Sequence, residues 1–178
     1  MAFLFKSGKM ASNVLDSMLT NAKAEKVIND GDLVVLGDVV KDEIYGNEEY
    51  DMYKADYPAA PTTDEICIVD YAGISEGLIS GNNYKLGVKL HDLAVPVGEP
   101  MRIRRLALHD KFWLGEDNFA AQPTVGKYAI ATASSGKHTP ADDATAEGYT
   151  VKIIAKRGFT AGMSADKEMY LCEVIKLA

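Results

Sequence analysis

Cysteine and histidine are scarce in this sequence of 178 residues, and their arrangement argues against a metal centre. The two cysteines, Cys67 and Cys172, each lie inside an apolar run, where free thiols are usually buried. No Cys-x-x-Cys pair is present, and no two of the three histidines have the spacing of zinc ligands. We therefore expect two buried thiols, with a disulfide between them left open, and neither a metal site nor a cofactor.

Long apolar runs are lacking too, and none approaches the length of a membrane-spanning helix. The apolar patch Phe3-Leu4-Phe5 is followed at once by Lys6 and Ser7-Gly8-Lys9, which makes it too short for the core of a signal peptide. We therefore expect a protein that is made in a cytoplasm and has no membrane partner.

Positive charge is in the minority, because 19 lysines and arginines stand against 26 acidic residues and give a net charge of −7. Phosphate binding needs a cationic surface, so we expect no nucleic-acid partner. The basic cluster is Arg102, Arg104 and Arg105, of which the first two share one face of a predicted strand. These arginines would meet either an acidic partner or acidic residues of the same chain, such as those in 42–56.

A convincing catalytic constellation is missing as well. The segment Gly73-Ile74-Ser75-Glu76-Gly77 matches the G-x-S-x-G nucleophile elbow, which needs a helix directly after the serine. Gly81-Asn82-Asn83 would break such a helix, and His109-Asp110 suits an exposed turn better than a general-base pair. We expect a protein that is not an enzyme, with a serine hydrolase that uses Ser75 as an alternative.

Short β-type runs are what the chain has in abundance. The stretch Gly31–Val40 reads GDLVVLGDVV, in which a turn signal precedes an apolar, β-branched run and a glycine interrupts it. Similar runs recur at short spacing, and Tyr149–Lys156 alternates apolar and polar residues. The pattern predicts a mainly β fold, either a small barrel or a sandwich.

The first 23 residues differ from the rest. Residues 1–9 indicate an extended arm, and Ser12 or Asn13 can cap one short amphipathic helix that packs on its own core or on a partner. We predict arm and helix in residues 1–23 and a single β-rich domain in residues 24–178. The apolar stripe of the expected helix consists of Val14, Leu15, Met18, Leu19 and Ala22.

Residues 41–63 interleave acidic residues with tyrosines and show no helix or strand period. We predict a long loop here, and loops of this length in a compact domain are uncommon unless they have a function. Tyrosines such as Tyr50 and Tyr53 suit an interface, although a merely solvated loop remains the alternative.

Two stretches resemble the capsid decoration, or cement, proteins of tailed phages. These are GDLVVLGDVV at 31–40 and YKLGVKLHDLAVPVGEPMRI at 84–103, because strands of the form G-D-x-V and V-G-x-x-V follow a flexible N-terminal segment in that family. Residues 112–119 and 124–128 look similar to later strands of phage head accessory proteins. The long loop at 41–63 departs from a minimal decoration fold.

The resemblance implies a structural virion protein that binds the outer surface of an icosahedral capsid and clamps neighbouring subunits. Its partners would be the major capsid protein and further copies of itself, often as a homotrimer, and it would reach the capsid exterior after assembly in the host cytoplasm. Another virion β-protein, such as a tail-tube or head-fibre component, is the alternative. We expect the partner contacts to come from an arm that orders on contact and from the loop at 41–63. The expected contact residues are Phe3, Leu4, Phe5, Val14, Leu15, Met18, Tyr50 and Tyr53.

Overall fold

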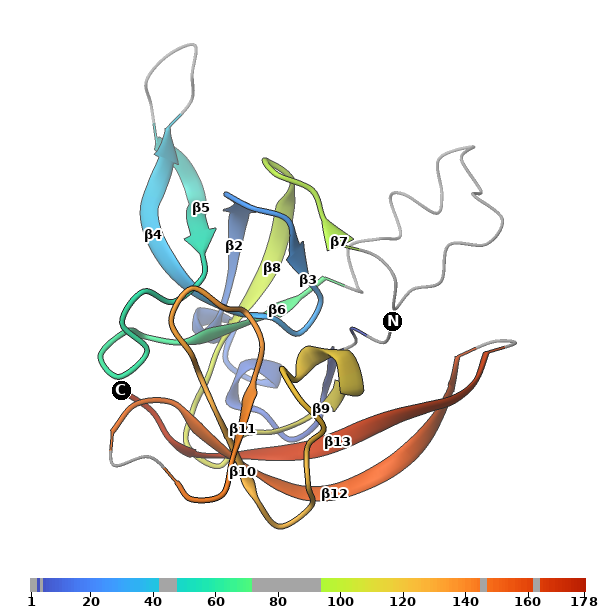
Figure 1. Ribbon diagram of the computed structural model, residues 1–178. Coiled ribbons are helices and arrows are strands. Elements are labelled where there is room, and N and C mark those ends of the chain that lie inside the picture. The colour runs from blue at the N-terminus through green and yellow to red at the C-terminus, as the bar shows by residue number, and fades with distance from the viewer. Residues whose placement is uncertain (1–2, 4, 42–47, 72–93, 145–146, 162–163) are drawn as a thin grey trace.

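The computed structural model describes all residues except 1–2, 4, 42–47, 72–93, 145–146 and 162–163, and it is mainly β (Figure 1). In the described part, strands β1 to β13 account for most of the structure, and the helical elements there are short 3-10 turns. The predicted mainly β fold is therefore confirmed. Ser75 and residues 84–93, the first half of one of the two stretches that resemble phage decoration proteins, lie outside the described residues.

Five strands form a closed barrel in the order β2-β5-β4-β6-β8, and β8 pairs with β2 to complete it. All neighbouring pairs are antiparallel except β2 with β5, which are parallel. Ala22, Ala24 and Ala55 are buried inside, where small residues suit the narrow interior of a five-stranded barrel. The barrel strands are β2 (Leu19–Ala24), β4 (Leu33–Lys41), β5 (Glu48–Asp56), β6 (Cys67–Asp70) and β8 (Pro100–Arg105).

The second layer is a six-stranded sheet with the order β1-β9-β13-β12-β10-β11. Its strands are β1 (Phe5–Ser7), β9 (Lys111–Gly115), β10 (Tyr128–Ile130), β11 (Thr139–Ala141), β12 (Thr150–Ala161) and β13 (Ser164–Lys176). A small separate ladder pairs β3 (Ile28–Asn29) with β7 (Ala94–Val95). The 3-10 turns are η1 (Ala11–Asn13), η2 (Asp16–Met18) and η4 (Glu116–Asn118).

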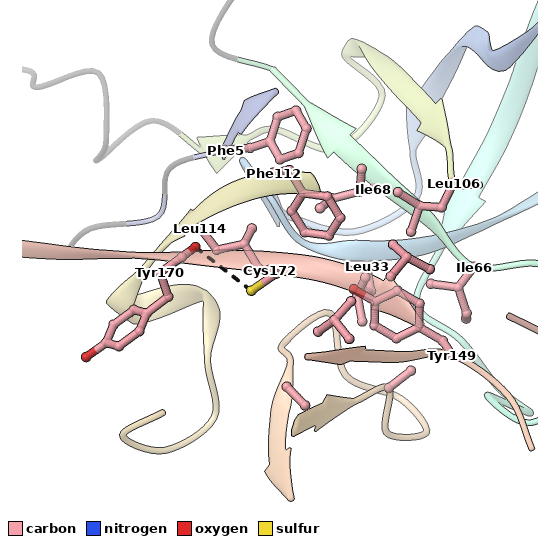
Figure 2. Close-up of a cluster of buried hydrophobic side chains, with 14 of the residues drawn as sticks. Phe5, Leu33, Ile66, Ile68, Leu106, Phe112, Leu114, Tyr149, Tyr170 and Cys172 are labelled. Carbon is pink, nitrogen blue, oxygen red and sulfur yellow. Dashed lines mark hydrogen bonds between the residues drawn. The ribbon is translucent and has the colours of Figure 1, made fainter. Parts of the chain in front are cut away.

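Barrel and sheet share a core, because strands β4 and β6 present alternate residues to two sides. Leu33 and Ile68 point toward the sheet, whereas Val34 and Cys67 belong to the cluster inside the barrel. Figure 2 shows the shared core, in which aromatic and aliphatic side chains of the sheet meet those of the barrel wall. The sheet contributes Phe5, Phe112, Leu114, Tyr170 and Cys172, among others, and Tyr149 joins them from the position directly before β12.

The N-terminal predictions of an arm, a helix and a boundary at residue 23 are wrong. Phe5–Ser7 forms strand β1 on β9, and Phe3 and Phe5 are buried. The expected helix is replaced by the turns η1 and η2 and by β2, since pairing of Leu19–Ala24 with two barrel strands outweighs its helical spacing. The boundary at residue 23 falls inside β2, and residues 5–7 belong to the sheet.

The predicted loop at 41–63 is wrong at residues 48–56, whereas residues 57–63 are not part of a strand and residues 42–47 lie outside the described residues. Residues 48–56 form barrel strand β5, which pairs with β4 on one side and β2 on the other. The period of a strand was not apparent in the sequence here, because the tyrosines were read as polar loop residues. Tyr53 in fact packs against the barrel cluster from a half-buried position. Tertiary pairing fixes this strand more than local sequence pattern does.

The carboxylate of Asp30 clips the N-terminal strand to the barrel. One oxygen accepts the Phe5 amide and the other accepts the Tyr71 amide, each at 2.8 Å, and the residue is only 1% exposed. The Asn118 side chain donates to the Asp30 carbonyl at 2.7 Å, which ties η4 to the same point. A single buried acid thus joins three segments that are far apart in the sequence.

We expect Asp30→Ala to lower the free energy of unfolding by about 3 kcal/mol or more, because two buried amides lose charge-assisted acceptors. Urea unfolding followed by the fluorescence of the single tryptophan, Trp113, measures this loss. Asp38→Ala, at an exposed position of β4, is the control and should change stability by less than about 0.5 kcal/mol. Equal stability of the two variants would contradict the clip.

His138 packs beside Phe119 and Tyr149 of the shared core and has no exposed surface. Its Nε2 faces the Gly31 carbonyl at 3.4 Å and its Nδ1 faces the Tyr149 hydroxyl at 3.2 Å. A neutral ring with its proton on Nε2 satisfies both contacts, because the carbonyl can only accept. Burial lowers the pKa of His138 to about 4.

Acid should therefore destabilise the protein through His138. The unfolded ring takes up a proton near pH 6.5 while the folded ring stays neutral until about pH 4, so stability is lost as the pH falls through this window. Between pH 7 and pH 5 we expect a loss of about 2 kcal/mol that His138→Gln does not show. Burial raises the pKa of Asp32, so this carboxyl makes the protein more stable as the pH falls. Parent and variant share this contribution, and it cancels when the unfolding free energy of the variant is subtracted from that of the parent at each pH. Parallel pH profiles for parent and variant would refute the assignment.

Candidate functional site

The most exposed apolar side chains near the N-terminus lie in the segment Ala11–Met18, here called the N-terminal corner. Val14 is 84% exposed and Leu15 is 52% exposed, and Met18 is half-buried. Three of the residues expected from the sequence to contact a partner therefore lie together on one short segment. Of these three, Val14 and Leu15 present apolar surface that nothing in the described part of the chain covers.

The other expected contact residues are placed differently. The rings of Phe3 and Phe5 are buried, and the Phe5 ring packs on Phe112 with 5.7 Å between ring centroids. They cannot anchor a free arm, because they already belong to the fold. Tyr53 is half-buried against the barrel cluster, and Leu4 and the side chain of Tyr50 lie outside the described residues.

Asp110 holds the first turn of the N-terminal corner. Its two carboxylate oxygens accept the amides of Ala11 at 2.7 Å and Ala107 at 2.9 Å, and its backbone carbonyl accepts the amide of Val174 in β13. This carboxylate is buried, whereas the sequence placed His109-Asp110 in an exposed turn. Only His109 is exposed, in the left-handed region with φ of 68°.

Arg104 holds the second side of the N-terminal corner from strand β8. Its Nη1 donates to Ser12 Oγ at 3.1 Å and to Asn13 Oδ1 at 3.0 Å, and its Nε donates to Asp70 at 2.7 Å. Arg104 is only 7% exposed, so its charge is compensated by Asp70 rather than by water. Its guanidinium also lies 5.9 Å from the centroid of the Phe5 ring, which connects the corner to β1.

The arginine cluster is therefore a structural feature of this chain. The partners found for Arg104 and Arg105 are Asp70 and Glu65, and Arg102 lies 3.8 Å from the same Asp70. These acids come from β6 and from the residue two before it, so the arginines meet acidic residues of their own chain, whereas the acidic side chains at 42–51 lie outside the described residues. The short strand β6 brings Asp70 and Glu65 beside β8, a pairing that sequence spacing does not reveal.

The corner thus has a rigid base and an apolar tip. Buried hydrogen bonds fix the backbone at residues 11–13, directly before the exposed pair Val14 and Leu15. A surface that is already ordered loses little conformational entropy when a partner covers it. Exposed apolar groups on such a base suit protein–protein contact better than chemistry.

The described residues offer little for catalysis. No group of three or more His, Cys, Asp or Glu side chains in this part of the chain could hold a metal ion. Cys67 and Cys172 are free and buried, as expected, and burial raises the pKa of both thiols, that of Cys67 to about 12. Where the structure describes the chain, no helix is long and apolar enough to span a membrane.

Comparison with known proteins adds no relative. No protein-family model matches the chain, and no curated protein matches it either.

We expect Arg104→Met to destabilise the protein by about 3–5 kcal/mol, because it leaves the Asp70 carboxylate buried beside an apolar side chain. Arg105→Met is the matched control, since Arg105 pairs with the exposed Glu65 and should cost less than about 1 kcal/mol. Denaturant unfolding of both variants gives the comparison. Adding Asp70→Asn to Arg104→Met should recover part of the loss, and similar costs for the two arginines would exclude a supporting role for the ion pair.

Proposed function

We propose that this protein is a structural, non-catalytic virion component that attaches to the outer surface of a tailed-phage capsid through its N-terminal corner. The observation that carries the proposal is the pairing of an exposed apolar tip, Val14 and Leu15, with a buried polar base. The resemblance of residues 31–40 and 84–103 to phage decoration proteins supplies the partner, the major capsid protein.

The energetics of this contact favour many weak, equivalent attachments. Full burial of Val14 and Leu15 would contribute about 1.5–3 kcal/mol each, and the fixed backbone keeps the ordering cost low. This is modest for one copy. On a capsid, however, every copy meets the same lattice, so the stabilisation of the shell is the sum over all copies.

This mode of attachment differs from an arm that orders on contact. Phe3 and Phe5 are core residues, and their removal would unfold part of the sheet rather than free an anchor. The N-terminal corner would instead meet its partner as a surface that is already ordered before binding. The partner is the one that the resemblance implies, and the segment that meets it is the N-terminal corner instead of a free arm.

Two β-ribbons extend the reach of the molecule and suit the clamping of neighbouring subunits (Figure 1). Among the described strands, β12 pairs with β10 only at residues 150–152 and β13 pairs with β9 only at 169–173, so in this part of the chain their distal halves pair only with each other. Residues 156–161 alone extend about 20 Å. Strands β4 and β5 form a shorter ribbon in the same way, and the free edges of both ribbons can accept a strand from a neighbour.

We expect Val14→Ser/Leu15→Ser to weaken capsid binding at least about 30-fold while leaving the free energy of unfolding nearly unchanged, because both side chains are exposed. The measurement is co-sedimentation with shells assembled from the major capsid protein encoded nearest to the gene of this protein. Val27→Ser/Val97→Ser is the control, since these valines are 58% and 62% exposed elsewhere on the surface.

Three results would count against the proposal. Shells that bind neither parent nor variant would exclude capsid attachment, and localisation to the tail or to a head fibre would favour the alternative virion roles. Equal binding by both double variants would exclude the corner. Labelling of Ser75 by a serine-reactive phosphonate, with turnover that depends on Ser75, would favour a hydrolase instead.

A further inference from the structure

The six-stranded sheet has a second face, called the outer face, which points away from the barrel (Figure 1). Strand pairing determines its members, because paired residues share a side and alternate residues along a strand do too. One row across the sheet contains Lys6, Trp113, Leu171 and Ala155. The next row contains Lys111, Glu173, Lys152 and Tyr128.

The outer face is basic in an acidic protein. At the described strand positions of this face the charged residues are Lys6, Lys111, Lys152, Arg157, Lys176 and Glu173. Five cations therefore stand against one acid on a chain whose net charge is −7. The lysines and the arginine come from four strands, so the cluster is invisible in the linear sequence.

Part of this charge is uncompensated. Glu173 already lies 3.6 Å from Lys111 and 3.2 Å from His109. Among the described residues no carboxylate pairs with Lys6, Lys152 or Arg157, and all three are exposed. The guanidinium of Arg157 lies 4.1 Å from the centroid of the Trp113 ring and covers it.

The opposite charge is concentrated on the other ribbon of the same chain. Beyond the barrel, strands β4 and β5 contain Asp38, Glu48, Glu49 and Asp51 but only one cation, Lys41. This β4–β5 ribbon projects from the end of the molecule opposite the sheet (Figure 1). It cannot reach the outer face of its own chain, so any contact between the two must join different copies.

We infer that the outer face binds the acidic β4–β5 ribbon of a second copy of this chain. The two surfaces are different, which makes the contact heterologous and lets it close into a ring or continue as a chain. A nucleic acid fits less well, since Arg157 occupies the Trp113 ring face that a base would need and the rest of the chain repels phosphate. The inference depends on charge and register alone, and it stands whether or not the protein binds a capsid.

Sedimentation velocity of the full chain, with charge reversals on each surface, tests the contact. Lys152→Glu/Arg157→Glu and Glu48→Lys/Glu49→Lys should each abolish self-association. Mixed together, they should associate with each other, because the intact ribbon of the first binds the intact outer face of the second and the reversed charges of the other two surfaces are complementary as well. The parent should associate at least about tenfold more weakly in about 1 M salt, where the Debye length is about 3 Å.

Lys23→Glu/Lys54→Glu is the matched control, because it changes the net charge equally but lies on barrel strands, and it should still self-associate. Circular dichroism checks that every variant is folded. A parent that stays monomeric in low salt, a variant of either surface that still associates, or a mixture that does not associate would each overturn the inference. Binding of single-stranded DNA to the outer face in place of the second copy would overturn it too.

Discussion

Buried carboxylates that accept backbone amides are the interaction on which the rest of this structure depends. Asp30 and Asp110 each join segments that are distant in the chain, and neither is part of a regular ladder. A β-protein with many short strands leaves amides unpaired wherever a strand ends, and a buried unpaired amide is costly. An ionised acid with two oxygens can satisfy two such amides at once. The edges of the barrel and the sheet are thereby joined without a disulfide or a metal in the described part of the chain.

The same principle explains why the N-terminal segment is ordered. Asp30 holds β1, and the pair of Arg104 and Asp70 holds the turn that follows. Residues 5–7 therefore complete the sheet rather than extend from it. This arrangement places Val14 and Leu15 on a fixed support, and the proposed attachment to a larger protein assembly depends on that support more than on the two side chains themselves.

The fold class was predictable from the sequence, whereas the site was predictable only in part. Short β-branched runs and turn residues predicted a mainly β protein, and the strand at 149–156 forms most of β12. Val14 and Leu15 were selected for a helical stripe that does not exist, yet their exposure keeps them as candidates. The supporting acids were missed, since Asp30, Asp70 and Asp110 look like ordinary turn or strand-end residues. Which amide or arginine each one meets depends on long-range pairing, and a single sequence does not encode that pairing in a local pattern.

The division of the interior into two clusters has a practical consequence. Cys67 lies inside the barrel and Cys172 lies in the shared core, and neither thiol is oxidised or accessible. Alkylation of each sulfur must wait until its own cluster opens, because both thiols are buried in the closed state. The time course of alkylation at the two cysteines, measured by mass spectrometry, would thus show whether the two hydrophobic clusters open together or one opens before the other.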